Sequence, residues 1–414
     1  MKQYVIIGNG VAAAGCIEGI RSLDQNGGIT VISEEPYAVY CRPLISYYLE
    51  EKTDPDRMRY REIDFYKKSG VRVLYGEKAT AIDAQKKTVS LASGDSLCYD
   101  ALCVAAGSSP FVPPFEGLET VEQKYSFFTL DDAFALEKDT DKKKKVLIVG
   151  AGLIGLKCAE GLRDRVGDFT VCDLSDRILS SILDAKRAAA VQRHLEANGI
   201  RFLLKNSVKQ FDRHTALMQK GERVPFDILV LAVGVRPNKE LVQKAGGEVN
   251  RGVCVDDRMQ TSFPSVFSAG DCAEGTDASC GEKRVLAIMP NAYMQGFTAG
   301  VNMAGGDTVF NNAIPMNAIG FFGLHVMTAG TYTGDVYEES DEAGSKTFFI
   351  KDGFLKGFIL IGKTARAGLY TSLIREQIPL DQIDFERMKK SATSAAFSVK
   401  KRRTMFGGKK DAAV

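Results

Sequence analysis

Two glycine-rich loops, about 140 residues apart, constrain the fold of this chain more than any other feature. The first loop, Gly8–Ala13, follows the apolar run Tyr4–Ile7, and the second, Gly150–Gly155, follows Val146–Val149. Each run predicts a strand and each loop predicts the start of a helix, which together place the pyrophosphate of a dinucleotide at a helix N-terminus. Two such units in one chain predict an α/β fold with two Rossmann-like nucleotide-binding domains.

Each position of such a loop has its own physical task. The first glycine turns the chain out of the strand, the second leaves room for the phosphate, and the third small residue lets the helix pack on the sheet. In that order, the two loops supply Gly8, Gly10 and Ala13, and Gly150, Gly152 and Gly155. The predicted binding loops are completed by Val11, Ala12, Leu153 and Ile154.

An acidic residue follows the next predicted strand after each loop. Glu34 lies 26 residues beyond Gly8, and Asp173 lies 23 residues beyond Gly150, close to the spacing of about 20 at which a carboxylate accepts the ribose hydroxyls. Asp173 favours NADH, because the 2′-phosphate of NADPH would meet a like charge. Arg177 would soften that preference.

Composition excludes several other classes of protein. The net charge of +2 over 414 residues does not suggest nucleic-acid binding, and no apolar run approaches the roughly 18 residues of a membrane span. The first strand begins at Tyr4, which leaves no room for a signal peptide. Nine scattered cysteines predict reduced thiols in the cytoplasm, with the Cys98–Cys103 spacing a coincidence. Three isolated histidines give no metal site.

The order of segments predicts three domains. The first nucleotide domain is expected over 1–115 and 245–325, the second over 116–244, and a small α+β domain with a basic tail over 326–414. Prolines at 110, 113 and 114 mark the first crossing. The strand-then-glycine pattern of 99–107 returns at 226–234, an internal repeat at the scale of a domain.

These features together make the chain resemble the two-dinucleotide-binding flavoproteins. That group contains rubredoxin and ferredoxin reductases, NADH oxidases and peroxidases, and the N-terminal part of assimilatory nitrite reductase. The resemblance covers residues 3–330 well and the last domain loosely. Besides the two loops, it is carried by Tyr40–Leu44, Tyr99–Gly107, Gly234–Asn238, Ala269–Asp271 and Pro290–Gly296.

The resemblance implies FAD in the first domain, NAD(P)H in the second, with NADP the less favoured form, and an interface role for the C-terminal domain. Asp271 would bind the ribitol chain, and a helix starting near Asn291 and Ala292 would point at the flavin. Arg42 and Pro43 would lie beside the isoalloxazine ring. The implied set is completed by Ala79, Ala106 and Gly107 on the FAD side and Gly234 on the nicotinamide side.

The chain also departs from the family pattern. Where peroxidase and oxidase members carry a redox cysteine, this chain has Pro43, and Cys41 lies two residues earlier. Cys41 is therefore interpreted as a small polar neighbour of the flavin rather than a catalytic thiol. The Thr of the family's Ala-Thr-Gly is Ala106, and a Glu near the nicotinamide is replaced by Lys157.

The favoured function is electron transfer from NADH through FAD to a one-electron acceptor. That acceptor is expected to be a rubredoxin or ferredoxin, or the Fe–S subunit of a larger oxidoreductase complex. One alternative is an NADH oxidase, peroxidase or disulfide reductase that uses Cys41. Another is a flavin-bearing subunit whose nicotinamide site Lys157 has disabled. A homodimer through the C-terminal domain and a partner bound by the basic tail are both open.

Overall fold

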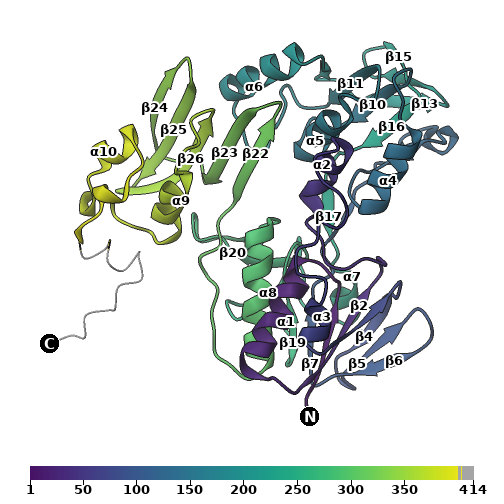
Figure 1. The fold of residues 1–414 in the computed structure, drawn as a ribbon, viewed down its shortest axis with the longest axis vertical. Helices are drawn as coiled ribbons and strands as arrows, with labels where there is room; N and C mark the ends of the chain where they lie inside the picture. Colours follow the sequence, from purple (N-terminus) through teal and green to yellow (C-terminus); the bar gives the residue numbers. More distant parts are fainter. Residues whose placement is uncertain (400–401, 403–414) are drawn as a thin grey trace. The chain divides into compact units, whose positions relative to one another are not determined.

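The computed structural model describes residues 1–399 and 402, and its contacts divide the chain into two compact units (Figure 1). The first unit is Met1–Glu274 with Ala292–Val309. The second is Gly275–Asn291 with the described residues from Phe310 onward. The three predicted domain boundaries stay a prediction, and the basic tail lies outside the described residues except for Arg402.

The first glycine loop follows the central strand of a parallel sheet. The strand order is β19 (Val266–Ser268), β7 (Ala101–Val104), β1 (Gln3–Ile7), β2 (Gly28–Ser33) and β3 (Val71–Tyr75). The central strand β1 is buried from Tyr4 to Ile7, as expected for a strand covered on both faces. The chain leaves β1 through the glycine loop, enters α1 (Val11–Leu23) and returns as β2.

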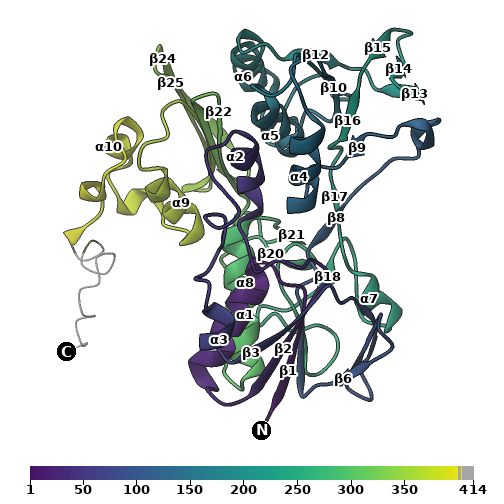
Figure 2. The same ribbon diagram turned by 45° about the vertical axis from the view of Figure 1, so that its right-hand side comes forward.

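The second glycine loop repeats this plan on its own parallel sheet (Figure 2). The strand order is β12 (Arg201–Leu204), β11 (Asp168–Asp173), β10 (Lys145–Val149), β16 (Ile228–Leu231) and β9 (Lys124–Tyr125). The associated helices are α5 (Leu153–Leu162), α4 (Leu130–Asp139) and α6 (Ala185–Ala197). The prediction of two Rossmann-like halves is confirmed.

Smaller elements complete the first unit. Two antiparallel sheets contain β4 (Ala79–Asp83), β5 (Thr88–Leu91) and β6 (Ser96–Cys98), and β13 (Val208–Asp212), β14 (Thr215–Met218) and β15 (Arg223–Pro225). The strands β8 (Ser108–Pro110) and β17 (Val235–Pro237) pair antiparallel where the chain passes between the two parallel sheets. Short elements are η1 (Arg42–Leu44), α2 (Ile45–Leu49), α3 (Phe65–Lys68), η2 (Leu118–Thr120), α7 (Glu240–Lys244) and β18 (Val253–Cys254).

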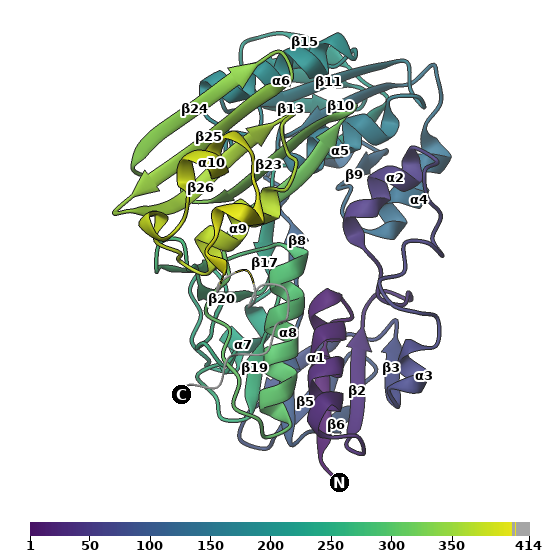
Figure 3. The same ribbon diagram turned by 60° about the vertical axis from the view of Figure 1, so that its left-hand side comes forward.

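Glycines bring α1 and α8 (Met289–Met303) into close contact, and the two helices lie side by side in Figures 1 to 3. A Cβ atom on Gly296 would lie 2.0 Å from the carbonyl oxygen of Ala12, and one on Gly300 would lie 2.1 Å from that of Cys16. On α1, a Cβ at Gly15 would lie 2.3 Å from the carbonyl oxygen of Tyr293. Larger side chains would push the helices apart, so these glycines fix α8 beside the first loop.

The second unit is an antiparallel sheet with helices. Its strand order is β22 (Met316–Phe321), β23 (Leu324–Gly330), β26 (Phe354–Ile361), β25 (Gly344–Lys351) and β24 (Asp335–Asp341). The helices α9 (Ala367–Arg375) and α10 (Phe385–Lys390) enclose a core that includes Phe348, Phe358 and Tyr370. Other elements are β20 (Ala273–Thr276), which begins in the first unit, β21 (Lys283–Val285), η3 (Leu380–Gln382) and η4 (Ser394–Ala396).

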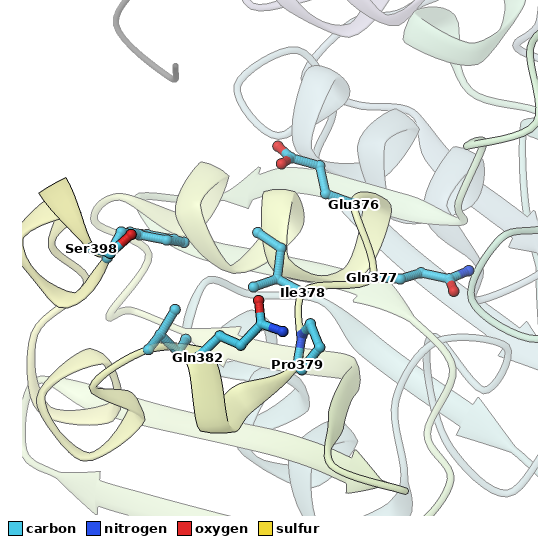
Figure 4. A pocket seen from close by; sticks show the side chains of 8 residues that line it. Glu376, Gln377, Ile378, Pro379, Gln382 and Ser398 are labelled. Atoms are coloured by element: carbon cyan, nitrogen blue, oxygen red, sulfur yellow. The ribbon is translucent and has the colours of Figure 1, made fainter. Parts of the chain in front are cut away.

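Two further features of the structure are a cavity in the second unit and the character of the helices. The second unit has a cavity of about 250 Å³, lined by Glu376, Ile378, Pro379, Gln382 and neighbouring residues (Figure 4). Among the described residues, no helix has the length and apolar character needed to cross a membrane.

Candidate nucleotide and flavin sites

The first glycine loop has the geometry of a phosphate cradle. Gly8 has φ of +100°, and a Cβ there would lie 2.2 Å from the carbonyl oxygen of Ala105. Gly10 instead has an extended backbone, and a Cβ there would meet no atom within 4 Å. Gly8 is thus required by the turn, whereas Gly10 leaves open the space that a phosphate would fill.

The second loop reproduces these distances. Gly150 has φ of +116°, and a Cβ there would lie 2.2 Å from the carbonyl oxygen of Ala232, while Gly152 again faces open space. A Cβ at Gly155 would lie 2.0 Å from the carbonyl oxygen of Gly150, which explains the need for a glycine at the third position. In the first loop that position is Ala13, which is fully buried.

Both helix N-termini suit an anion. The N-cap residues of α1 and α5 are Gly10 and Gly152, and neither helix has a side-chain cap or an acidic residue in its first turn. The backbone N–H groups of Val11, Ala12, Leu153 and Ile154 therefore face no competing side-chain cap. Both cradles fit the pyrophosphate of a dinucleotide.

The carboxylate of Asp173 is held rigidly beside the second cradle. Its Oδ2 accepts a hydrogen bond of 2.7 Å from the N–H of Ala151, and its Oδ1 accepts one of 2.7 Å from the N–H of Ser175. Arg177 donates to Asp176 at 2.7 Å and to the Leu183 carbonyl at 3.1 Å. The arginine is thus engaged by other acceptors, and the acid remains the charged group next to the loop.

Replacing Asp173 with alanine is expected to leave FAD bound and to weaken NADH binding. The loss of a charged acceptor costs about 1.5–3 kcal/mol, which corresponds to a KM for NADH raised roughly 10- to 100-fold. Steady-state kinetics with a flavin-content assay checks this. Asp176→Ala is the matched control, since Asp176 contacts Arg177 on the same loop. An unchanged KM in Asp173→Ala would contradict the assignment of the second loop.

The acidic residue after the first loop, Glu34, has a different environment from that of Asp173. The Glu34 side chain is 64% exposed and pairs with Lys78 at 3.2 Å. Its neighbour Glu35 accepts a hydrogen bond of 2.7 Å from the Tyr40 hydroxyl and pairs with Arg42. Glu34 is therefore free to turn toward a ribose, whereas Glu35, which the sequence did not single out, orders the segment that carries Arg42.

Cys41, Arg42 and Pro43 form the start of η1 and lead directly into α2. Arg42 donates to the carbonyl of Phe128 at 3.2 Å and thereby links this segment to the stretch before α4. Burial raises the pKa of the Cys41 thiol, and the N–H of Leu44 offsets this in part. A protonated thiol is a poor nucleophile, so this environment favours a packing role for Cys41.

The side chain of the predicted ribitol-binding residue, Asp271, is half-buried. Burial raises its pKa, while the charge of Arg42 and the hydroxyl of Ser108 act in the opposite direction. A carboxylate that is partly withdrawn from water gains from further hydrogen-bond donors, and sugar hydroxyls would supply them. The preceding Gly270 has φ of +82°, and a Cβ there would lie 3.0 Å from the Cβ of Ala12.

The remaining predicted residues lie next to the β8–β17 pair, in the first turn of α8 and in β4. Asn238 donates to the Ala106 carbonyl at 2.8 Å and through its N–H to the Gly107 carbonyl at 3.0 Å. Gly107 and Gly234 both have positive φ and open space where a Cβ would be. Asn291 and Ala292 are buried in the first turn of α8, and Ala79 is buried in β4.

Lys157 lies on α5 and its charge is compensated. It forms an ion pair with Glu160, and these side chains are only 15% and 7% exposed. Its ammonium nitrogen also lies 4.8 Å from the centre of the Tyr47 ring on α2. The cation is thus held between two neighbouring elements, rather than presented as a bare charge.

Sequence reasoning missed one contact of the first loop. The Tyr66 hydroxyl donates to the Asn9 side chain at 2.7 Å and accepts the N–H of Val39 at 3.0 Å. Asn9 is the second residue of the loop, and it lies 57 residues before Tyr66. No local pattern links residues so far apart in sequence.

The two cradles, each with its own parallel sheet and acid, define an NAD(P)H-dependent flavoprotein oxidoreductase that binds FAD and NAD(H). The chain belongs to the pyridine nucleotide-disulphide oxidoreductase family, whose model matches residues 2–296. The resemblance and the cofactor prediction are thereby confirmed. In the described residues, no group of three or more His, Cys, Asp or Glu side chains could hold a metal ion.

Two relatives and one solved structure illustrate the similarity. Over 393 residues the chain is 31% identical to the NADH-dependent phenylglyoxylate dehydrogenase subunit epsilon of Aromatoleum evansii, covering 91% of this chain and 92% of that protein. It is 32% identical over 390 residues to the assimilatory nitrate reductase electron transfer subunit of Bacillus subtilis (strain 168). That match covers 91% of this chain but 50% of the relative, so the chain spans half its length. The covalent putidaredoxin reductase–putidaredoxin complex superposes with a TM-score of 0.88 at 20% identity over 99% of both chains, which shows the fold alone.

Proposed function

We propose that this chain takes electrons from NADH through FAD and passes them one at a time to an iron–sulfur acceptor. The acceptor is a small rubredoxin- or ferredoxin-type protein, or the Fe–S subunit of a larger oxidoreductase complex. The names of the two relatives support this choice, because one is a subunit of an NADH-dependent dehydrogenase and the other is an electron transfer subunit.

Different residues serve the FAD site and the NADH site. FAD, when bound, accepts a hydride from NADH and can release the electrons singly. The N–H groups after Gly10 and Gly152 hold the two pyrophosphates, and Asp173 and Asp271 orient the sugars. The positive charge of Arg42 acts on the Asp271 carboxylate and partly offsets the rise in its pKa that burial causes. The contact of the Lys157 ammonium with the Tyr47 ring joins α5 to α2 on the nicotinamide side.

The choice of acceptor is supported by the place of Cys41, two residues before Pro43, which occupies the position of the redox cysteine in peroxidase and oxidase members. Burial raises the pKa of the Cys41 thiol, which disfavours the thiolate that disulfide and peroxide chemistry requires. An oxidase, peroxidase or disulfide reductase using Cys41 is therefore the second candidate. The flavin-bearing subunit with a disabled nicotinamide site is the third, and the ion pair of Lys157 with Glu160 weighs against it.

The test is anaerobic stopped-flow absorbance at the flavin band. Mixing the holoprotein with NADH is expected to bleach the flavin quickly, and NADPH is expected to bleach it more slowly. Subsequent mixing with a rubredoxin or ferredoxin is expected to restore the colour. Bleaching by NADH without reoxidation by any one-electron acceptor would contradict the proposed acceptor class.

Replacing Cys41 with serine is expected to change NADH-dependent reduction of one-electron acceptors by less than about twofold, since serine has nearly the same shape and Cys41 is only half-buried. Steady-state assays with a one-electron acceptor, with peroxide and with a disulfide check this. Cys98→Ser, at an exposed cysteine, is the control. Loss of peroxide or disulfide turnover in Cys41→Ser alone would favour the second candidate.

A cytoplasmic location and an interface role for the second unit are part of the same proposal. None of the nine cysteines, all within the described residues, forms a disulfide, and five of them are buried. We also propose that the chain forms a homodimer through its C-terminal domain, residues 326–414.

A further inference from the structure

Three residues from distant parts of the sequence meet at one side of the first unit. Arg61 lies between α2 and α3, Glu18 on α1 and Tyr293 on α8. The Arg61 guanidinium binds both carboxylate oxygens of Glu18, with Nε to Oε1 at 2.6 Å and Nη2 to Oε2 at 3.0 Å. The Tyr293 hydroxyl donates to Oε2 of the same carboxylate at 2.5 Å. One carboxylate therefore joins three elements.

The aromatic rings hold the guanidinium in place. Its central carbon lies 4.5 Å from the ring centre of Tyr60 and 5.3 Å from that of Tyr293. A two-pronged contact of arginine with a carboxylate is the stronger kind of charged hydrogen bond, and stacking on aromatic rings limits its movement. Burial would raise the pKa of Glu18, but the bonds from Arg61 and Tyr293 outweigh it and lower the pKa. Glu18 and Arg61 thus stay ionised at neutral pH, while Tyr293, whose pKa is raised to about 12, stays protonated as a hydrogen-bond donor.

Arg61 ends a segment that also carries Cys41, Arg42 and Pro43. The base of this segment is the place where its two ends meet. We call residues 39–61 the strap. Its two ends are joined by hydrogen bonds from the N–H of Cys41 to the Met58 carbonyl at 2.8 Å and from the N–H of Tyr60 to the Val39 carbonyl at 2.9 Å. The next residue after this ladder is Arg61, so its bonds anchor the strap to α1 and α8.

These two helices are the ones that frame the FAD site. α1 begins at the first cradle, and the glycine contacts fix α8 against it. Arg42 directly follows Cys41 at the base of the strap, and its charge is close enough to act on Asp271. Movement of the strap base relative to α1 would therefore move Arg42 relative to the flavin-binding groups.

We propose that Arg61 is a positioning residue for FAD, which closes the strap over the bound flavin by anchoring it to Glu18 and Tyr293. The inference rests on the FAD site of the proposed function but not on its electron acceptor. A holoprotein that reduces no iron–sulfur protein would overturn the acceptor, while FAD release would still decide the role of Arg61.

The experiment compares Arg61→Met and Tyr293→Phe with the wild-type holoprotein. The readouts are the rate of FAD dissociation, followed by flavin fluorescence, and the midpoint potential of the bound flavin. Arg61→Met is expected to release FAD roughly 10- to 100-fold faster, as the loss of a charged hydrogen bond implies. Tyr293→Phe is expected to act in the same direction by about threefold or more, and both variants are expected to shift the potential.

The matched control is Arg57→Met, because Arg57 also lies in the strap but is 76% exposed and pairs only at 3.3 Å with Asp54. It is expected to match the wild type in both readouts. Adding Glu18→Gln to Arg61→Met is expected to accelerate FAD release little further, because the two substitutions remove the same contact between Arg61 and Glu18. A wild-type release rate and potential in Arg61→Met would overturn the proposal. If Arg61→Met does not fold, wild-type values in Tyr293→Phe would overturn it.

Discussion

Replacing Gly152 with valine is expected to give a folded, yellow protein whose flavin NADH no longer bleaches. Gly152 has φ of −84° and ψ of −171°, an extended conformation that valine adopts readily, and a Cβ there would meet no atom within 4 Å. The Cβ of the added side chain therefore meets no steric conflict, and the variant is expected to fold. It fills the space in which the second cradle would receive the pyrophosphate.

The expected loss of NADH affinity is at least about 100-fold, because two or more charge-assisted hydrogen bonds to phosphate are lost together. Stopped-flow bleaching over a range of NADH concentrations measures it, and the flavin content shows whether the first site is intact. Normal bleaching of the variant would mean that NADH does not use this loop.

The counterpart is Gly10→Val, which is expected to give a folded protein without FAD. Gly10 has φ of −92° and ψ of −168°, again with open space around a Cβ. The same steric argument applies to the first cradle, so FAD affinity is expected to fall by at least about 100-fold. The flavin-to-protein absorbance ratio of the purified variant, with circular dichroism to verify folding, checks this.

The two valine variants are controls for each other, since the loops have the same geometry but are expected to hold different dinucleotides. Gly152→Val should keep FAD, whereas Gly10→Val should lose it. The reverse pattern would mean that the two sites have been assigned in the wrong order. Gly8 and Gly150 are unsuitable for this comparison, because their positive φ and nearby carbonyl oxygens make any larger residue destabilising.

The tertiary structure adds the partners of two charged residues whose roles stay predictions. Arg177 was expected to soften the preference for NADH, yet it is engaged by Asp176 and the Leu183 carbonyl. Lys157 was expected to place a cation at the nicotinamide side, yet it pairs with Glu160 three residues along α5 and packs on Tyr47. A long side chain can reach several partners, and the sequence does not say which of them lies nearby.

The sequence by itself determined the two cradles and the class of enzyme. A turn with positive φ needs glycine at Gly8 and Gly150, and an apolar run before each loop needs burial, so local rules alone indicate two dinucleotide units. The tertiary structure alone decided how distant segments of the first nucleotide-binding half are held together. The meeting of Glu18, Arg61 and Tyr293 spans 275 residues of sequence, and the contact of α1 with α8 depends on glycines in two separate helices. Such contacts arise from packing between elements that are distant in sequence, and a local sequence pattern cannot predict them.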